Sequence, residues 1–281
     1  MRRSFYSFTG EFQKQNVLSP YTLISDYTLF FLPHSGGLVQ NSAHPSDATN
    51  KAVYEVLQAC QKSSSSCSVL PQRAFSLEYR LVQTTSFPGV LLDALAGYYY
   101  LLSECGFQAK NVIVMGDSAG GLLSLALARY LRDEKVLEMM GGLALLSPWL
   151  DMSLSYASTL NASNITNKST DYLTDSAVLS GVKHILCGMP RDAVHSPYLS
   201  PIALGSSIEP DLFEGFPKAI IFAGGLERSR DQIRDVARYY GDDKSVYFEE
   251  KDATHDYMAL PFNDVECKRT AKRISDWMRK M

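Results

Sequence analysis

Long apolar runs and an excess of charge of one sign are both missing from this chain of 281 residues. No stretch approaches the ~20 apolar residues that a membrane-spanning helix needs, so we expect no membrane span. The formal net charge is −3, and no basic footprint for nucleic acid is visible. The basic start, residues 1–3, is interrupted before any useful apolar run, which argues against a signal peptide and favours a cytoplasmic protein.

Cysteine and histidine are scarce, with five of each. An odd number of cysteines without metal-site spacing favours free thiols in a reducing compartment, with a Cys60–Cys67 disulfide as the alternative. None of the histidines has the spacing of a metal site, so we expect no metal. We also expect no cofactor, because the chemistry that the remaining motifs indicate requires none.

The most informative stretch is Gly116-Asp117-Ser118-Ala119-Gly120-Gly121, which fits the Gly-x-Ser-x-Gly pattern of a nucleophile elbow. The apolar residues 111–115 before it predict a buried strand, and the Leu- and Ala-rich residues 122–130 after it predict a buried helix. Such a turn exposes a serine hydroxyl at the carboxyl end of a parallel sheet. The sequence therefore predicts Ser118 as a nucleophile, with the Ala119 N–H at the helix start available to stabilise negative charge.

A serine nucleophile needs a base and an acid, and after such an elbow they follow at the ends of later strands. His255 comes after the predicted strand 245–250 and is the predicted base. The predicted strand 218–225 is followed by two carboxylates, Glu227 and Asp231. We favour Glu227 as the triad acid because it lies on the loop itself, and Asp231, about one turn into the next helix, is the alternative.

Two further groups of residues complete the predicted site. Gly36 and Gly37 follow the predicted strand 27–32 and are expected to offer backbone N–H groups to the oxyanion of a tetrahedral intermediate. The candidate substrate-pocket residues are Trp149, Asp117 and Tyr156. The aromatic residues among them indicate a lipophilic substrate, although aromatic residues near a cap more often serve structural packing.

Strands and helices alternate over residues 26–150 and again over 216–281, which predicts an α/β fold with a mostly parallel sheet and helices on both faces. The alternation fails over residues 151–215, which we interpret as a cap insertion over the active site. The aromatic residues 1–25 are interpreted as an N-terminal cap or lid segment, with peripheral membrane contact as an alternative.

These motifs together resemble the hormone-sensitive-lipase family of α/β-hydrolases, from about Asp26 to the C-terminus. The Gly-Asp-Ser-Ala-Gly-Gly segment is the family's signature, and Ser147-Pro148-Trp149-Leu150-Asp151 resembles the segment after its next strand. The resemblance implies the α/β-hydrolase fold, serine esterase activity, Ser118 and His255 as nucleophile and base, and Gly36, Gly37 and Ala119 as oxyanion donors. The family's Asp-x-Leu-Arg-Asp acid segment falls on residues 227–231, which supports Glu227.

The chain departs from the family pattern in three places. Ser35 stands where the family has its first oxyanion-loop glycine, and the acid is Glu instead of Asp. Few residues precede the first predicted parallel strand, which indicates either that edge strands are lost or that the segment is rebuilt into a different lid.

The predicted function is hydrolysis of carboxylic esters of a lipophilic small molecule through an acyl-enzyme. A lyase or cyclase that reuses the serine and histidine, and a catalytically silent binding protein, remain as alternatives. The oligomeric state also stays open, because the amphipathic last helix, residues 265–281, fits either a dimer contact or docking on the core.

Overall fold

The computed structural model describes residues 3–8, 12–15, 27–33, 48, 50–63, 70–205 and 211–281. Within these residues, eight strands form one sheet in the order β2-β1-β4-β3-β5-β6-β7-β8. Their bounds are β1 (Arg3–Phe8), β2 (Phe12–Gln15), β3 (Thr28–Leu32), β4 (Arg73–Leu77), β5 (Val112–Asp117), β6 (Gly142–Leu146), β7 (Lys218–Gly224) and β8 (Ser245–Glu250). Strands β3 to β8 run parallel to one another, so their carboxyl ends meet at one edge, as the sequence predicts.

The N-terminal residues contribute two antiparallel strands at the edge of the sheet. β1 pairs with β4, and β2 pairs with β1. The expectation that edge strands are lost is therefore wrong. The three aromatic residues within Arg3–Phe8 favour a strand, but a run this short is a weak signal. The interpretation of residues 1–25 as a lid, and their contact with a membrane, stay predictions.

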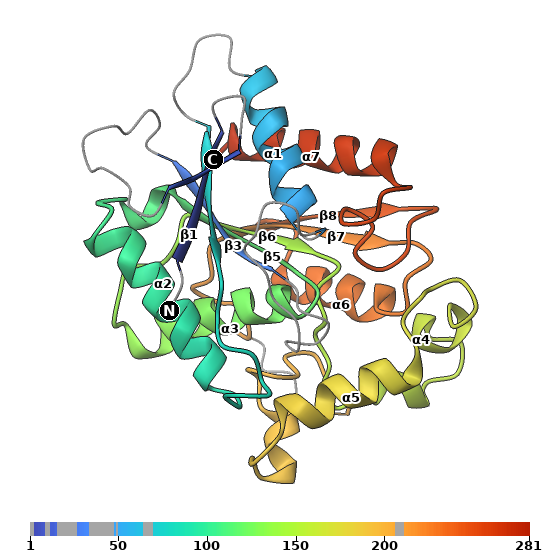
Figure 1. Ribbon diagram of the computed structural model, residues 1–281. Coiled ribbons are helices and arrows are strands. Elements are labelled where there is room, and N and C mark those ends of the chain that lie inside the picture. Colours follow the sequence, from blue (N-terminus) through green and yellow to red (C-terminus); the bar gives the residue numbers. More distant parts are fainter. Residues whose placement is uncertain are drawn as a thin grey trace.

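Helices cover both faces of the sheet (Figure 1). Alternate residues of β3 explain why: Leu29 and Phe31 belong to the core under one set of helices, and Phe30 and Leu32 to the core under the other. The first set is α1 (Asn50–Ser63) and α7 (Asp264–Met278), and the second is α2 (Gly89–Ser103), α3 (Ala119–Glu134) and α6 (Arg230–Tyr240). A sheet buried on both faces produces the near-continuous apolar strands seen in the sequence.

The last helix, α7, docks on the core. Its residues Cys267, Ala271 and Ile274 are buried in the same apolar cluster as Val53 and Leu57 of α1. Docking therefore accounts for the amphipathic pattern of α7, and the oligomeric state stays open.

The connection from β6 to β7 carries the segment that the sequence assigns to a cap, residues 151–215, called the cap segment below. Its described part contains α4 (Ser163–Thr166), α5 (Asp175–Ile185) and two short 3-10 helices (Ser155–Ser158 and Arg191–His195); a third 3-10 helix (Ala109–Asn111) precedes β5. Figure 1 shows α4 and α5 beyond α6, on the side of the sheet away from α1 and α7. No helix in the described part of the chain is long and apolar enough to cross a membrane.

Candidate active site

Ser118 lies in a strained turn between β5 and α3. Its φ of 49° and ψ of −119° are rarely adopted by residues other than glycine, and such a conformation costs about 1–3 kcal/mol. The turn also needs glycine on both sides. A Cβ at Gly120 would lie 2.0 Å from the Leu32 carbonyl oxygen, and one at Gly116 would lie 2.3 Å from the Gly120 carbonyl oxygen. The glycines of the elbow thus let the backbone pass close enough to hold Ser118 at the carboxyl edge of the sheet.

Ser118, His255 and Glu227 form a continuous hydrogen-bonded chain. His255 Nε2 lies 2.8 Å from Ser118 Oγ, and His255 Nδ1 lies 2.9 Å from Glu227 Oε2. The second carboxylate oxygen of Glu227 accepts a hydrogen bond of 2.7 Å from the Gly224 N–H. All three functional side chains are buried. This arrangement can move a proton from a serine hydroxyl to an imidazole that a carboxylate orients.

The loops after β7 and β8 are held together through their backbones, which fixes Glu227 against His255. The Gly225 N–H donates to the Glu250 carbonyl oxygen at 2.8 Å, and the Leu226 N–H donates to that of Ala253 at 2.9 Å. A Cβ at Gly224 would lie 2.4 Å from the Ala253 carbonyl oxygen. The close approach of the two loops therefore depends on glycine at position 224.

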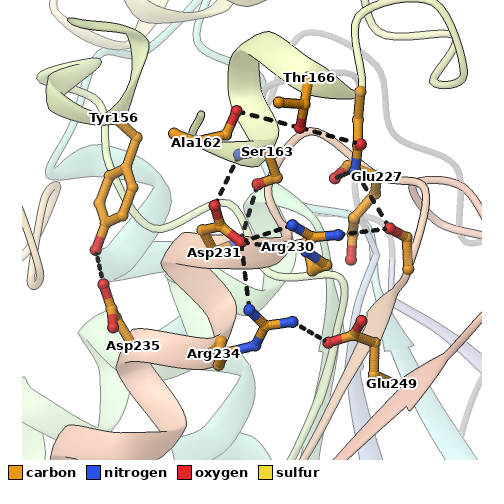
Figure 2. Close-up of polar contacts among 12 residues, drawn as sticks. Tyr156, Ala162, Ser163, Thr166, Glu227, Arg230, Asp231, Arg234, Asp235 and Glu249 are labelled. Atoms are coloured by element: carbon orange, nitrogen blue, oxygen red, sulfur yellow. Dashed lines mark hydrogen bonds and ion pairs between the residues drawn. The ribbon is translucent and has the colours of Figure 1, made fainter. Parts of the chain in front are cut away.

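Asp231 has a different environment, although it lies only four residues from Glu227. Its Oδ2 accepts a hydrogen bond of 2.7 Å from the Ser163 N–H at the start of α4. Its Oδ1 forms ion pairs with Arg230 and Arg234 (Figure 2). The structure thus brings Glu227 to His255 and places Asp231 between α6 and the cap segment.

A second carboxylate, which the sequence pattern does not single out, lies beside His255. Asp256 Oδ2 is 3.3 Å from His255 Nε2, and Asp256 is buried with a positive φ of 48°. In the sequence, the position of Asp256 directly after His255 is the one feature that indicates a carboxylate near the imidazole. Burial alone would lower the His255 pKa, but the carboxylates of Asp256, Glu227 and Asp171 outweigh burial and raise it. Burial raises the Glu227 pKa, while the hydrogen bonds from His255 and Gly224 oppose that rise.

A cavity of about 100 Å³ opens beside Ser118 and His255. Of the candidate pocket residues, Trp149 and Tyr156 line it. The ring of Tyr156 is anchored by its hydroxyl, which donates to Asp235 Oδ2 at 2.6 Å (Figure 2). Asp117 lies elsewhere: it lines a smaller cavity together with Ser147 and Asp256, so the structure does not bring it together with the other two.

The predicted oxyanion donors are only partly visible. Gly36 and Gly37 lie outside the described residues, as does Cys67, so these assignments stay predictions. Ala119 is the first residue of α3, so its N–H is one of those that a helix leaves without an intrahelical acceptor. Among the described residues, no group of three or more His, Cys, Asp or Glu side chains is arranged to hold a metal ion.

Comparison with known proteins agrees with this architecture. A family profile described as "alpha/beta hydrolase fold" matches residues 34–259. An esterase of Acinetobacter venetianus is 31% identical over 153 residues, which are 54% of this chain and 45% of that protein. An acetyl-hydrolase of Streptomyces hygroscopicus is 30% identical over 161 residues, 57% of this chain and 48% of that protein. The matched segments thus span about half the length of these curated relatives.

Solved structures extend the likeness over nearly the whole chain. A crystal structure of an esterase from the bacterial hormone-sensitive lipase family has a TM-score of 0.72 and 25% identity, and the match covers 91% of this chain and 77% of that one. The resemblance inferred from the Gly-Asp-Ser-Ala-Gly-Gly segment is confirmed. The fold and the family match show that the chain belongs to the α/β-hydrolase fold family. Within that family it is similar to esterases of the hormone-sensitive lipase family.

Proposed function

We propose that the protein is a serine hydrolase that cleaves carboxylic esters of a lipophilic small molecule. The observation that carries this proposal is the buried hydrogen-bonded chain from Ser118 Oγ through His255 to Glu227, beside a cavity whose exposed surface is mainly apolar although polar side chains also line it. The names of the relatives, esterase and acetyl-hydrolase, support the same reaction class.

In the acylation step, Ser118 Oγ attacks the ester carbonyl carbon while His255 Nε2 accepts the hydroxyl proton. Glu227 holds His255 in the tautomer that carries its proton on Nδ1, so that Nε2 is free to act as the base, and stabilises the imidazolium that forms. The tetrahedral intermediate then collapses, the bond to the alcohol oxygen breaks, and His255 returns the proton to that oxygen. The acyl group stays on Ser118.

The negative charge on the carbonyl oxygen needs donors at the same edge of the sheet. The Ala119 N–H at the start of α3 is one such donor, and the Gly36 and Gly37 N–H groups are proposed as the others. Losing a single oxyanion donor in serine hydrolases costs about 3–4 kcal/mol of transition-state stabilisation. These donors act on charge that develops only in the transition state, so they raise the rate of the chemical step.

Deacylation repeats these steps with water in place of the serine hydroxyl. His255 takes a proton from the water, the water oxygen attacks the acyl carbon, and Ser118 leaves with the proton that His255 returns. The products are the free acid and the free alcohol. This sequence is complete without a metal ion or a redox cofactor.

The test is turnover of a p-nitrophenyl ester series from acetate to decanoate by the wild-type protein and by Ser118→Ala. Ser180→Ala, at an exposed position on α5, serves as a control that removes a hydroxyl outside the cavity. We expect wild type and Ser180→Ala to turn over and to be labelled covalently by an organophosphonate, and Ser118→Ala to do neither. No turnover and no labelling of a folded wild-type protein would refute the hydrolase proposal and favour the lyase or binding-protein alternatives.

A further inference from the structure

The cavity carries a hydroxyl where the family pattern has an apolar side chain. Ser229 occupies the Leu position of the Asp-x-Leu-Arg-Asp acid segment described above. It is 4% exposed and stands at the N-cap of α6, yet its hydroxyl makes no capping hydrogen bond to the helix. Instead, Ser229 lines the cavity beside Ser118. A buried hydroxyl that the helix does not use is available to a bound molecule.

Gln232 lies one turn further along α6 and also lines the cavity. It is 5% exposed, and its Oε1 accepts a hydrogen bond of 2.9 Å from the buried Leu150 N–H. This bond fixes the orientation of the amide. The Nε2 group has no acceptor among the described residues. Because residues three apart share one side of a helix, Ser229 and Gln232 present two hydrogen-bond donors to the same part of the cavity.

The charged groups of the cavity, by contrast, are already engaged within the protein. The Asp151 carboxylate accepts hydrogen bonds from the hydroxyls of Ser153 and Ser155. The Arg228 guanidinium donates to the Leu173 carbonyl oxygen, to both oxygens of Asn164 and to Asp175. Most of the remaining lining is apolar or aromatic: Trp149, Leu154, Tyr156, Leu173, Ala177 and Val178. A charged substrate group therefore finds no free partner in these two side chains, whereas an uncharged acceptor finds two donors.

We propose that Ser229 and Gln232 bind a neutral carbonyl oxygen carried by the otherwise apolar group of the ester, so that the preferred substrate is a keto ester. The inference rests on the proposed ester hydrolysis for its kinetic readout. A carbonyl oxygen has two lone pairs and accepts from the Ser229 hydroxyl and the Gln232 amide together. An apolar group in the same place leaves both donors buried without an acceptor, which is how a polar site rejects a substrate lacking the matching group. Two neutral hydrogen bonds give a preference of roughly 10- to 100-fold.

The experiment compares esters that differ only by a ketone oxygen in place of a methyl group. On the acyl side the pair is p-nitrophenyl levulinate and p-nitrophenyl isocaproate, with longer homologues that move the ketone along the chain. On the alcohol side the pair is the acetate of a keto alcohol and that of its methyl isostere. The ratio of kcat/KM for keto over methyl ester is measured for the wild type, Ser229→Ala, Gln232→Glu and the Ser180→Ala control. Gln232→Glu keeps an oxygen for the Leu150 N–H and removes the donor.

Comparing ratios between variants removes the intrinsic reactivity of each ester. We expect the wild type and Ser180→Ala to favour one keto ester by roughly 10- to 100-fold over its isostere, and each cavity variant to lower that ratio by roughly 3- to 10-fold. A ratio near unity in the wild type, or one that the cavity variants leave unchanged, overturns the inference while ester hydrolysis stands.

Binding separates this inference from the proposed reaction. Calorimetric titration of the same uncleaved esters into Ser118→Ala measures the preference without turnover. One possible result is that the wild type hydrolyses no ester, whereas Ser118→Ala still binds the keto ester more tightly and Gln232→Glu in the Ser118→Ala background removes that preference. In that case the cavity assignment holds and the hydrolase proposal fails. Equal binding of the two esters, or none of either, overturns the cavity assignment.

Discussion

Glu227 and Asp231 offer a matched pair of carboxylates for testing which one acts as the triad acid. Both are acidic residues of one short segment, but Glu227 contacts His255 and Asp231 contacts the Ser163 N–H. Glu227→Gln and Asp231→Asn each replace one carboxylate oxygen by an NH₂ group and leave the size of the side chain almost unchanged. The two variants therefore make the same chemical change at two positions, so a difference in activity between them reports the position alone.

The cost of Glu227→Gln follows from its two hydrogen bonds. One oxygen accepts from His255 Nδ1 at 2.9 Å and the other from the Gly224 N–H at 2.7 Å. Glutamine has one oxygen for these two donors. If that oxygen stays with Gly224, the NH₂ group faces Nδ1 and forces His255 into the tautomer with its proton on Nε2, which cannot accept the Ser118 proton. The equivalent Asp→Asn change in a serine protease lowers kcat about 10⁴-fold, so we expect a loss of about 10³- to 10⁴-fold here.

Asp231→Asn keeps an oxygen for the Ser163 N–H and loses mainly its ion pairs with Arg230 and Arg234, which are partly exposed. Such pairs contribute about 0–1 kcal/mol to stability, so we expect a small drop in melting temperature and a change in kcat of less than about threefold. Initial rates with p-nitrophenyl acetate and melting curves by circular dichroism measure both effects. The reasoning is refuted if Glu227→Gln stays within about tenfold of wild type, or if Asp231→Asn loses as much activity as Glu227→Gln.

Three further predictions concern the base, the loops and the cap segment. Because the His255 pKa is raised above its usual 6.5, His255 stays protonated to higher pH, and kcat/KM is expected to fall as the pH drops through a value above 6.5. Asp256→Asn removes one of the carboxylates that raise this pKa, so we expect the acidic limb of the pH profile to move to lower pH. Gly224→Ala places a Cβ 2.4 Å from the Ala253 carbonyl oxygen, so we expect about 1–3 kcal/mol of destabilisation in urea unfolding and loss of turnover. Arg228→Met leaves the partly buried carbonyl oxygens of Asn164 and Leu173 without this donor, so we expect a cost of about 1–3 kcal/mol and faster proteolysis within residues 163–175.

Each of these has a result that contradicts it. An acidic limb that does not move in Asp256→Asn shows that this carboxylate does not set the His255 pKa. Wild-type activity in Gly224→Ala shows that the two loops can separate without disturbing the site. An unchanged rate of cap proteolysis in Arg228→Met shows that other contacts hold the cap segment.

The positions of Ser118 and His255 in the fold were predictable because local patterns encode them. An apolar run predicts a buried strand, and parallel strands place their following residues at one edge of the sheet. The same pattern favours Glu227 over Asp231, because a residue on the loop after β7 reaches the loop after β8 more easily than Asp231 on α6 does. The structure brings Ser118, His255 and Glu227 together within hydrogen-bond distance.

Other parts of the site depend on packing between segments far apart in the sequence, which no local pattern reports. Asp117 adjoins Ser118, but the reversal of the chain at the elbow turns it toward Asp256 and away from the Trp149 cavity. Gln232 of α6 is oriented in that cavity by its hydrogen bond with the Leu150 N–H, which lies 82 residues away in the chain, on the segment after β6.

The cap segment is hydrogen-bonded to the loop that carries Glu227, so the proposed mechanism couples the wall of the cavity to the proposed triad. Asn167 Nδ2 donates to the Glu227 carbonyl oxygen at 2.9 Å and to that of Gly225 at 3.2 Å. Asp171 accepts from the Arg228 N–H at 2.7 Å. The backbone that carries Glu227, the proposed triad acid, is thus fixed from the side of the cap segment as well as by β8. A change that loosens the cap segment therefore acts on the orientation of His255 as well as on the cavity wall, so kcat and KM should change together in such variants.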